Sequence, residues 1–160
     1  MRILFVAGLL LPMLLSGQES RDGLRFVFYN VENLFDPFND SLTADEEFLP
    51  GGIRGWTWKK FEDKVNRIHK VLVALGGWEP PELIALCEVE NYFVLHWLVN
   101  ETPMRKHEYR VIHRDSPDPR GIDVALLYRP GFFLPVRYHY YPVPVRDLHP
   151  DPTRDILYVT

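Results

Sequence analysis

Two polar residues, Asn30 and Glu88, stand directly after apolar runs and are of types that could do chemistry together. Asn30 follows LRFVFY (24–29), and Glu88 follows LIALC (83–87). Both runs are typical of buried strands, the first of a strand buried on both faces, so the amide and the carboxylate stand where strands end. Ligands gather at strand ends, where a carboxylate suits a hard divalent cation and an amide suits a bound water or substrate oxygen. Strand-end Asn and Glu also cap turns or pair with arginine, so the pair alone leaves both interpretations open.

A helix and a second strand must position these residues. Apolar residues recur at spacings of three and four from Trp58 to Leu75, which predicts an amphipathic helix with Thr57 as its N-cap and Gly76-Gly77 as its end. The solvent side of this helix is assigned to Lys59, Lys60, Glu62, Asp63, Lys64 and Arg67. A strand, a helix and another strand in this order predict a crossover packed on a sheet.

The rest of the chain predicts a loop, a second helix and more strands. Residues 36–55 are rich in Asp, Glu, Gly and Pro, which favours a long surface loop. A second helix is predicted over 91–100, and strands are predicted over 109–113, 122–128, 132–140 and 156–159. The fold class is therefore α/β with a mixed sheet.

The first residues have the pattern of a secretory signal peptide. A basic start at Arg2 precedes an apolar run over 3–15, and the small residues Ser16 and Gly17 follow it. This order predicts a signal peptide over 1–17 and a secreted or periplasmic protein. The apolar run is shorter than the roughly 20 residues that span a bilayer, so no transmembrane segment is expected after the signal is removed.

Charge and cysteine content exclude two classes of protein. The chain has 18 basic and 22 acidic residues, a formal net charge of −4, which excludes binding of nucleic acid by bulk charge. If the protein acts on phosphates, a bound divalent cation and a few local arginines must supply the positive field. The single cysteine, Cys87, excludes an internal disulfide framework and is expected to be a small core residue. The oligomeric state is left open.

Three segments resemble the endonuclease/exonuclease/phosphatase family. They are FYNVENLFD (28–36), LCEVEN (86–91) and RGIDVALLY (120–128), the last as in the secreted bacterial, deoxyribonuclease I-like branch. Their order and approximate spacing agree with the family, and the similarity covers nearly all of residues 18–160. One such motif would be weak evidence, whereas three in order are specific. The resemblance implies a four-layered α/β/β/α sandwich with mixed β-sheets and a metal-dependent phosphoester hydrolase.

The resemblance also implies roles for single residues. Glu88 would bind Mg²⁺, with Mn²⁺ as an alternative ion, and Asn30 would orient a metal-bound water or a phosphate oxygen. Arg154 resembles the phosphate-binding arginine of deoxyribonuclease-like members, although pairing with its neighbour Asp155 is an equal alternative.

Two residues of the third motif are further candidates near the expected cleft. Arg120 would contact a substrate phosphate. Asp123 is included among the substrate-site candidates and is expected to orient a neighbour rather than bind metal.

The sequence departs from the family where the second half of the domain is expected. The family carries a catalytic histidine in an Asn-His-Trp-like segment, a Gly-Asp-Phe-Asn-like loop and a terminal Asp-His pair, and none of these occurs in this sequence. The His96-Trp97 pair lies in the second predicted helix and is not that motif. We therefore expect residues 18–160 to be the N-terminal portion of the domain, with its C-terminal half missing, and to be inactive and poorly stable alone.

Two functions remain to be compared. The first is a metal-dependent phosphodiesterase, a nuclease, with nucleic acid as the phosphoester substrate; relatives also cut sphingomyelin and inositol phosphates. The second is an exported binding module that keeps part of the fold without the chemistry. Metal binding by the complete protein, with Glu88→Ala as the control, separates them.

Overall fold

The computed structural model describes residues 23–77, 79–144 and 151–160. The signal peptide predicted over 1–17 lies outside these residues. Within them, no helix is both long and apolar enough to cross a membrane.

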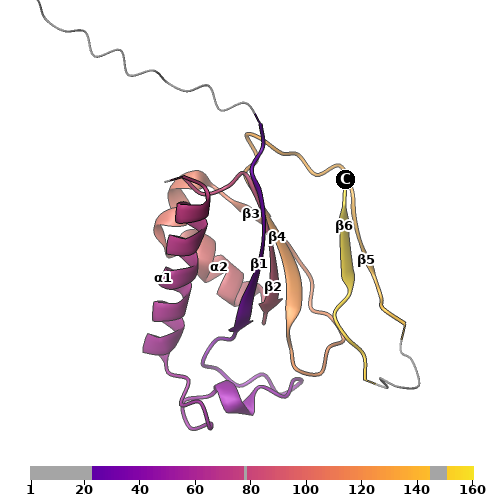
Figure 1. Ribbon diagram of the computed structural model, residues 1–160. Helices are drawn as coiled ribbons and strands as arrows, with labels where there is room; N and C mark the ends of the chain where they lie inside the picture. The colour runs from indigo at the N-terminus through magenta and orange to yellow at the C-terminus, as the bar shows by residue number, and fades with distance from the viewer. Residues whose placement is uncertain (1–22, 78, 145–150) are drawn as a thin grey trace, which may run out of the picture.

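A mixed four-stranded sheet forms the centre of the structure (Figure 1). Its strand order is β1 (Phe26–Leu34), β2 (Leu83–Val89), β4 (Asp123–Tyr128) and β3 (Arg110–His113). β1 and β2 are parallel, whereas β2 with β4 and β3 with β4 are antiparallel. The prediction of an α/β fold with a mixed sheet is therefore confirmed.

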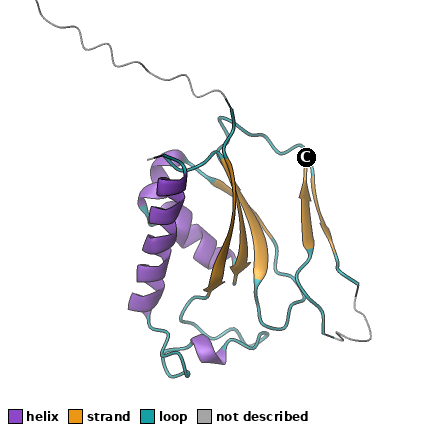
Figure 2. Ribbon diagram, viewed as in Figure 1, coloured by secondary structure: helices purple, strands orange, loops and turns teal. Residues whose placement is uncertain are grey.

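Two helices cover one side of this sheet, and a two-stranded sheet lies on the other (Figure 2). The helices are α1 (Trp58–Leu75) and α2 (Tyr92–Asn100). The second sheet pairs β5 (Tyr138–Tyr141) with β6 (Ile156–Val159) in antiparallel order. The described residues thus give helices, sheet and sheet in that order, and the four-layered sandwich stays a prediction.

The main core lies between the helices and the four-stranded sheet. Phe61, Val65, Ile68 and Leu72 of α1 are at most 3% exposed, as the three-and-four spacing predicts. Thr57 is the N-cap of α1, since its side chain accepts a hydrogen bond from the Lys60 amide, and Gly76 is the C-cap. Two 3₁₀ turns, Glu46–Phe48 and Pro103–His107, complete the elements that the structure describes.

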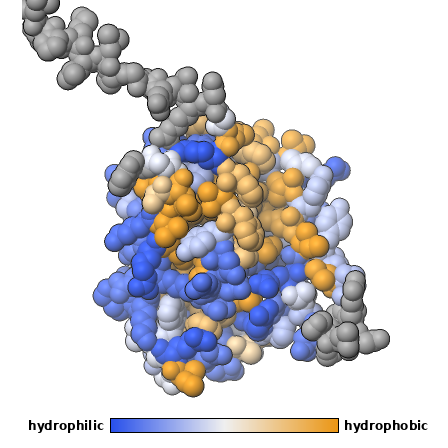
Figure 3. Space-filling view, viewed as in Figure 1, coloured by the Kyte–Doolittle hydropathy of each residue, from blue (hydrophilic) through white to orange (hydrophobic). Residues whose placement is uncertain are grey.

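The opposite face of β1 differs from the prediction of a strand buried on both faces. Phe26 and Phe28 are 59% and 67% exposed. They line a cavity of about 480 Å³ that Leu157 and Val159 border from β6. β6 contacts β4, two strands away from β1, so the second sheet leaves the β1 edge uncovered among the described residues. Figure 3 shows apolar residues gathered over β1 on this side.

The strand predicted over 132–140 is shorter and later than expected. It is β5, and it begins at Tyr138. The amides of Phe132 and Phe133 both donate at 3.0 Å to the carbonyl of Arg129, which makes a turn of this segment. Pro135 has no N–H to give to a strand ladder, so the extended pairing cannot start before it.

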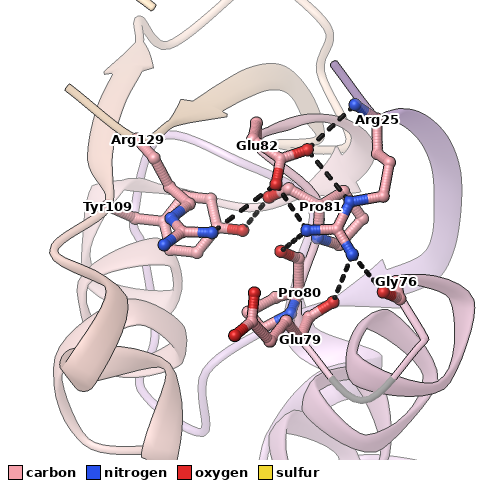
Figure 4. Close-up of polar contacts among 8 residues, drawn as sticks. All are labelled: Arg25, Gly76, Glu79, Pro80, Pro81, Glu82, Tyr109 and Arg129. Atoms are coloured by element: carbon pink, nitrogen blue, oxygen red, sulfur yellow. Dashed lines mark hydrogen bonds and ion pairs between the residues drawn. The ribbon is translucent and has the colours of Figure 1, made fainter. Parts of the chain in front are cut away.

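A polar network lies at the end of the four-stranded sheet that is opposite to Asn30 and Glu88 (Figure 4). Arg25 donates through its backbone N and its Nε to Glu82 Oε2 at 2.9 and 3.0 Å, and through Nη2 to Glu82 Oε1. The same guanidinium donates to the carbonyls of Gly76, Glu79 and Pro80. Arg129 Nη1 lies 3.6 Å from Glu82 Oε1. The network ties β1 to the connection between α1 and β2.

The start of α2 gives a first testable prediction. Asn91 caps this helix by accepting from the Val94 amide at 3.1 Å, and its Nδ2 donates to Asp36 Oδ2 at 3.0 Å. We expect Asn91→Ala to lower the free energy of unfolding by about 1 kcal/mol or more, because both bonds are lost. Asn91→Ser keeps a capping oxygen but not the bond to Asp36, so its loss should be smaller. Urea denaturation measures both; equal stability of Asn91→Ala and the unchanged protein would contradict the prediction.

Candidate active site at the ends of β1 and β2

Glu88 is the extra residue of a β-bulge. Cys87 pairs with Val124 and Val89 pairs with Asp123, so two neighbouring residues of β4 face three residues of β2. Glu88 has a φ of +63°, which is unusual for a residue with a side chain. Bulges re-aim side chains, and strained backbone of this kind concentrates at functional sites. The bulge therefore turns the carboxylate out of the regular strand alternation.

β1 is irregular at the same level. Its pairing with β2 is interrupted between Asn30 and Leu34, and the intervening Glu32 and Asn33 have φ values of +56° and +62°. Lys64 of α1 donates to the carbonyls of both residues, to that of Asn33 at 3.0 Å. Burial lowers the pKa of Lys64 to about 8. A half-buried ammonium thus holds the segment of β1 that follows Asn30.

The structure brings Asn30 and Glu88 together. Asn30 Nδ2 donates to Glu88 Oε1 at 3.0 Å, and Asn30 Oδ1 accepts from the Glu32 amide at 2.8 Å. The second bond fixes which end of the amide faces the carboxylate. The Glu88 side chain is 21% exposed, so a ligand can reach it from solvent.

Arg154 and Arg120 lie on the other side of Glu88 and share the carboxylate of Asp118. Arg154 Nη1 is 3.7 Å from Glu88 Oε1, and its Nε is 3.9 Å from Asp118 Oδ2. Arg120 contacts both oxygens of Asp118 at 2.7 to 2.9 Å while its side chain stays 58% exposed. Burial acts to raise the pKa of Asp118, but the hydrogen bonds from Arg120 and the charges of Arg120 and Arg154 together outweigh it, and the pKa is lowered.

Asp155, the alternative partner of Arg154, pairs with a different arginine. Asp155 forms its ion pair with Arg114. Arg154 therefore faces Glu88 and Asp118 rather than its sequence neighbour.

Asp123 does not join this group, and its place among the substrate-site candidates stays a prediction. It is 2% exposed, its Oδ1 accepts from the Ser116 amide at 2.8 Å, and its Oδ2 lies 2.9 Å from His113 Nε2. Each oxygen thus has a partner inside the protein. Asp123 contacts His113, and orienting a neighbouring residue is the role that the sequence favoured for it.

His113, Asp115 and Asp123 also have ligand atoms that all lie within 4.8 Å of one another. This group has the residue types of a metal site. However, Asp115 is 86% exposed and its Oδ1 is 4.0 Å from His113 Nδ1, and each oxygen of Asp123 already has a partner within the protein. The geometry favours a buried His–Asp pair.

The donor set around Glu88 fits a hard divalent ion. Within the described residues both contacts of this carboxylate use Oε1, and Oε2 is left for a ligand. Mg²⁺ is commonly held by one or two carboxylates together with water and substrate phosphate, so a single accessible carboxylate suffices.

Two residues of the site were missed from the sequence. Asp118 stands two positions before Arg120 in Asp-Pro-Arg-Gly, a turn pattern that signals its local bonds but not its approach to Arg154. Lys64 was assigned to solvent and is half-buried, because the irregular part of β1 supplies carbonyls for it.

The turn that carries Asp118 and Arg120 requires a glycine at position 121. Gly121 has a φ of +66°, and a Cβ there would lie 2.7 Å from the Thr43 side chain.

Comparisons with known proteins agree with these motifs. The model of a family described as "Endonuclease/Exonuclease/phosphatase family" matches residues 25–160. No curated protein matches the chain, and neither does a solved structure. The family match includes Asn30, Glu88, Asp118, Arg120 and Arg154.

Proposed function

The chain belongs to the endonuclease/exonuclease/phosphatase family, and we propose that it contributes the metal-binding part of a Mg²⁺-dependent nuclease. The family is generally hydrolytic, acts on phosphoesters and depends on divalent metal. The finer proposal is that the bond cleaved is a phosphodiester of nucleic acid and that Mn²⁺ can replace Mg²⁺. The signal-peptide pattern of residues 1–17 supports a secreted or periplasmic location.

One constellation supports the proposal above all others. Glu88 stands at a bulged strand end with the Asn30 amide at 3.0 Å and the Arg154 guanidinium at 3.7 Å. A carboxylate, an amide and a guanidinium are the groups needed to hold a divalent ion beside a phosphate. An exported binding module without chemistry is not favoured, because the family is generally hydrolytic.

Each side chain has a distinct part in the proposed reaction. A divalent ion held by Glu88 would polarise a phosphoryl oxygen and stabilise the leaving group. Asn30 fixes the carboxylate through Oε1 and so leaves Oε2 for binding. Arg154 lies beyond hydrogen-bond distance of Glu88, so it can turn to a phosphate, which a guanidinium binds with two parallel bonds.

Residues 1–160 contain no Asn-His-Trp-like segment and no Asp-His pair. We therefore propose that these residues alone bind metal without turning over substrate. The complete protein, meaning the product of the whole reading frame, is the subject of the experiments below.

Removal of metal tests the proposed function. We expect the complete protein to hydrolyse a phosphodiester only with Mg²⁺ or Mn²⁺ present, and to lose the activity in EDTA, because the phosphoryl charge then has no cation beside Glu88. Excess Mg²⁺ should restore the rate, and EDTA already saturated with Mg²⁺ is the control. Hydrolysis that continues unchanged in EDTA would contradict a metal-dependent mechanism.

A further inference from the structure

A basic pocket lies next to the proposed active site, on the α1 side of β1. It has a volume of about 580 Å³ and is lined by the basic side chains Arg54, Lys60, Lys64 and Arg67, with Glu32 and Asp63 as its acidic ones. Lys60, Lys64 and Arg67 follow one another at helical spacing, so α1 presents them on one face. We call this cavity the basic pocket.

Two of the four cations of the basic pocket, Lys60 and Lys64, are positioned by neutral groups. Lys60 Nζ donates to the carbonyl of Arg54 at 2.7 Å, and Lys64 Nζ donates to that of Asn33 at 3.0 Å. Lys64 also lies 5.6 Å from the centre of the Trp56 ring. Carbonyls and rings hold an ammonium in place without neutralising its charge.

Few of these charges are compensated by carboxylates. Arg54 pairs with Glu47 at 2.7 Å. Among the residues that the structure describes, Lys60, Lys64 and Arg67 take part in no ion pair within 4.0 Å. Although burial lowers the pKa of Lys64 to about 8, its amine is still mostly charged at neutral pH. An anion from outside the described chain would complete the pocket.

The basic pocket and the two site arginines flank Glu88 on opposite sides. β2 lies between β1 and β4 in the sheet. The pocket borders β1 at Glu32 and Asn33, directly after Asn30, whereas Arg120 stands just before β4 and Arg154 lies beside Asp118. Glu88 is close enough to Lys64 to act electrostatically on its pKa. Positive groups thus extend along the strand ends beyond the position of one phosphate.

We propose that the basic pocket binds a second phosphate of a polynucleotide strand whose neighbouring phosphodiester lies at Glu88 and Arg154. The inference rests on the proposed function and specifies its substrate as a strand with several phosphates. A single phosphoester can occupy only one of the two positive regions, whereas a nucleic acid carries phosphates at regular intervals. With a net charge of −4, the chain attracts a polyanion only through such local groups.

Binding of an oligonucleotide tests the basic pocket independently of catalysis. The variant is Lys60→Ala with Arg67→Ala in the complete protein, because both residues are exposed and their loss should leave the fold intact. The matched control is Lys70→Ala with Lys106→Ala, two exposed basic residues that do not line the pocket. A fluorescein-labelled oligonucleotide is titrated in EDTA, where no metal-dependent cleavage competes, and the Kd is read by anisotropy over a range of NaCl concentrations.

We expect the pocket variant to raise the Kd about tenfold and to reduce the slope of log Kd against log salt by about 0.7, the value for one phosphate contact on a single strand. The control variant should stay within about twofold of the unchanged protein. An unchanged Kd in the pocket variant, or an equal rise in the control, would overturn the inference.

Kinetics separate this inference from the proposed function. With Mg²⁺, the pocket variant should raise the KM for the oligonucleotide and leave the hydrolysis of bis(4-nitrophenyl) phosphate, which has one phosphate, unchanged. An equal loss on both substrates would show that the residues act on the catalytic centre, and would overturn the inference. If the unchanged protein hydrolyses neither substrate, the proposed function fails, while the binding experiment still decides whether the pocket takes a polynucleotide.

Discussion

We expect Glu88→Gln to lower the kcat of the complete protein for phosphodiester hydrolysis by about 10³-fold, with little change in stability. Glutamine keeps the size of the side chain and an oxygen for the Asn30 amide, so the local geometry is preserved. It removes the negative charge that a divalent ion requires. It also leaves Arg154 without a carboxylate at 3.7 Å. The effect should therefore appear in metal affinity and turnover rather than in folding.

Two further variants separate a metal ligand from a residue that only positions it. Asn30→Ala should lower the kcat for phosphodiester hydrolysis by about 10- to 100-fold, because it loosens the Glu88 side chain without removing its charge. Glu101→Gln, an exposed carboxylate at the end of α2, should leave the rate unchanged. Mn²⁺ binding followed by electron paramagnetic resonance gives a readout besides activity. If Glu88→Gln bound Mn²⁺ as tightly as the unchanged protein and kept its kcat, the assignment of Glu88 would be wrong.

The sequence located Asn30 and Glu88 because local pattern carries that information. Each apolar run marks where a buried strand gives way to polar residues, and the parallel order of the two strands brings their ends together. The helix from Trp58 to Leu75 was equally readable from its spacing and its caps. These features depend on residues close in the chain, where propensity and periodicity act directly.

Other features depend on register and on distant partners, which no local pattern contains. The bulge at Glu88 exists only relative to Val124 and Asp123 of β4. The exposure of Phe28 depends on how far β6 extends over the sheet, and the same residue would be buried under a wider layer. The burial of Lys64 follows from carbonyls that turn toward α1. Apolar residues that recur with a period of 2 or 3.6 identify a strand or a helix, but they do not show which other element packs over it.

The largest effect on folding is expected at the other end of the sheet, at Glu82. Its side chain is 7% exposed and accepts three hydrogen bonds from Arg25. Glu82→Gln removes the negative charge that both the Arg25 and the Arg129 guanidinium groups contact, and these groups are only 26% and 17% exposed. Breaking a buried pair in this way costs about 3 kcal/mol or more. Urea denaturation at neutral pH should therefore show a lower free energy of unfolding, with Glu46→Gln, an exposed carboxylate, as the control.

The pH dependence of stability distinguishes this ion pair from a loss of packing. The hydrogen bond from Arg25 is the largest cause that lowers the pKa of Glu82 from 4.5 to about 2. A carboxyl with a lowered pKa in the folded state stabilises the fold fully above about 4.5 and loses that contribution as the pH falls toward about 2. The unchanged protein should lose stability through this range, and Glu82→Gln should lose less, because it has no proton to take up there. The two curves should therefore converge near pH 2. If they instead ran parallel from neutral pH down to that point, the stability of this sheet end would not come from the charge of Glu82.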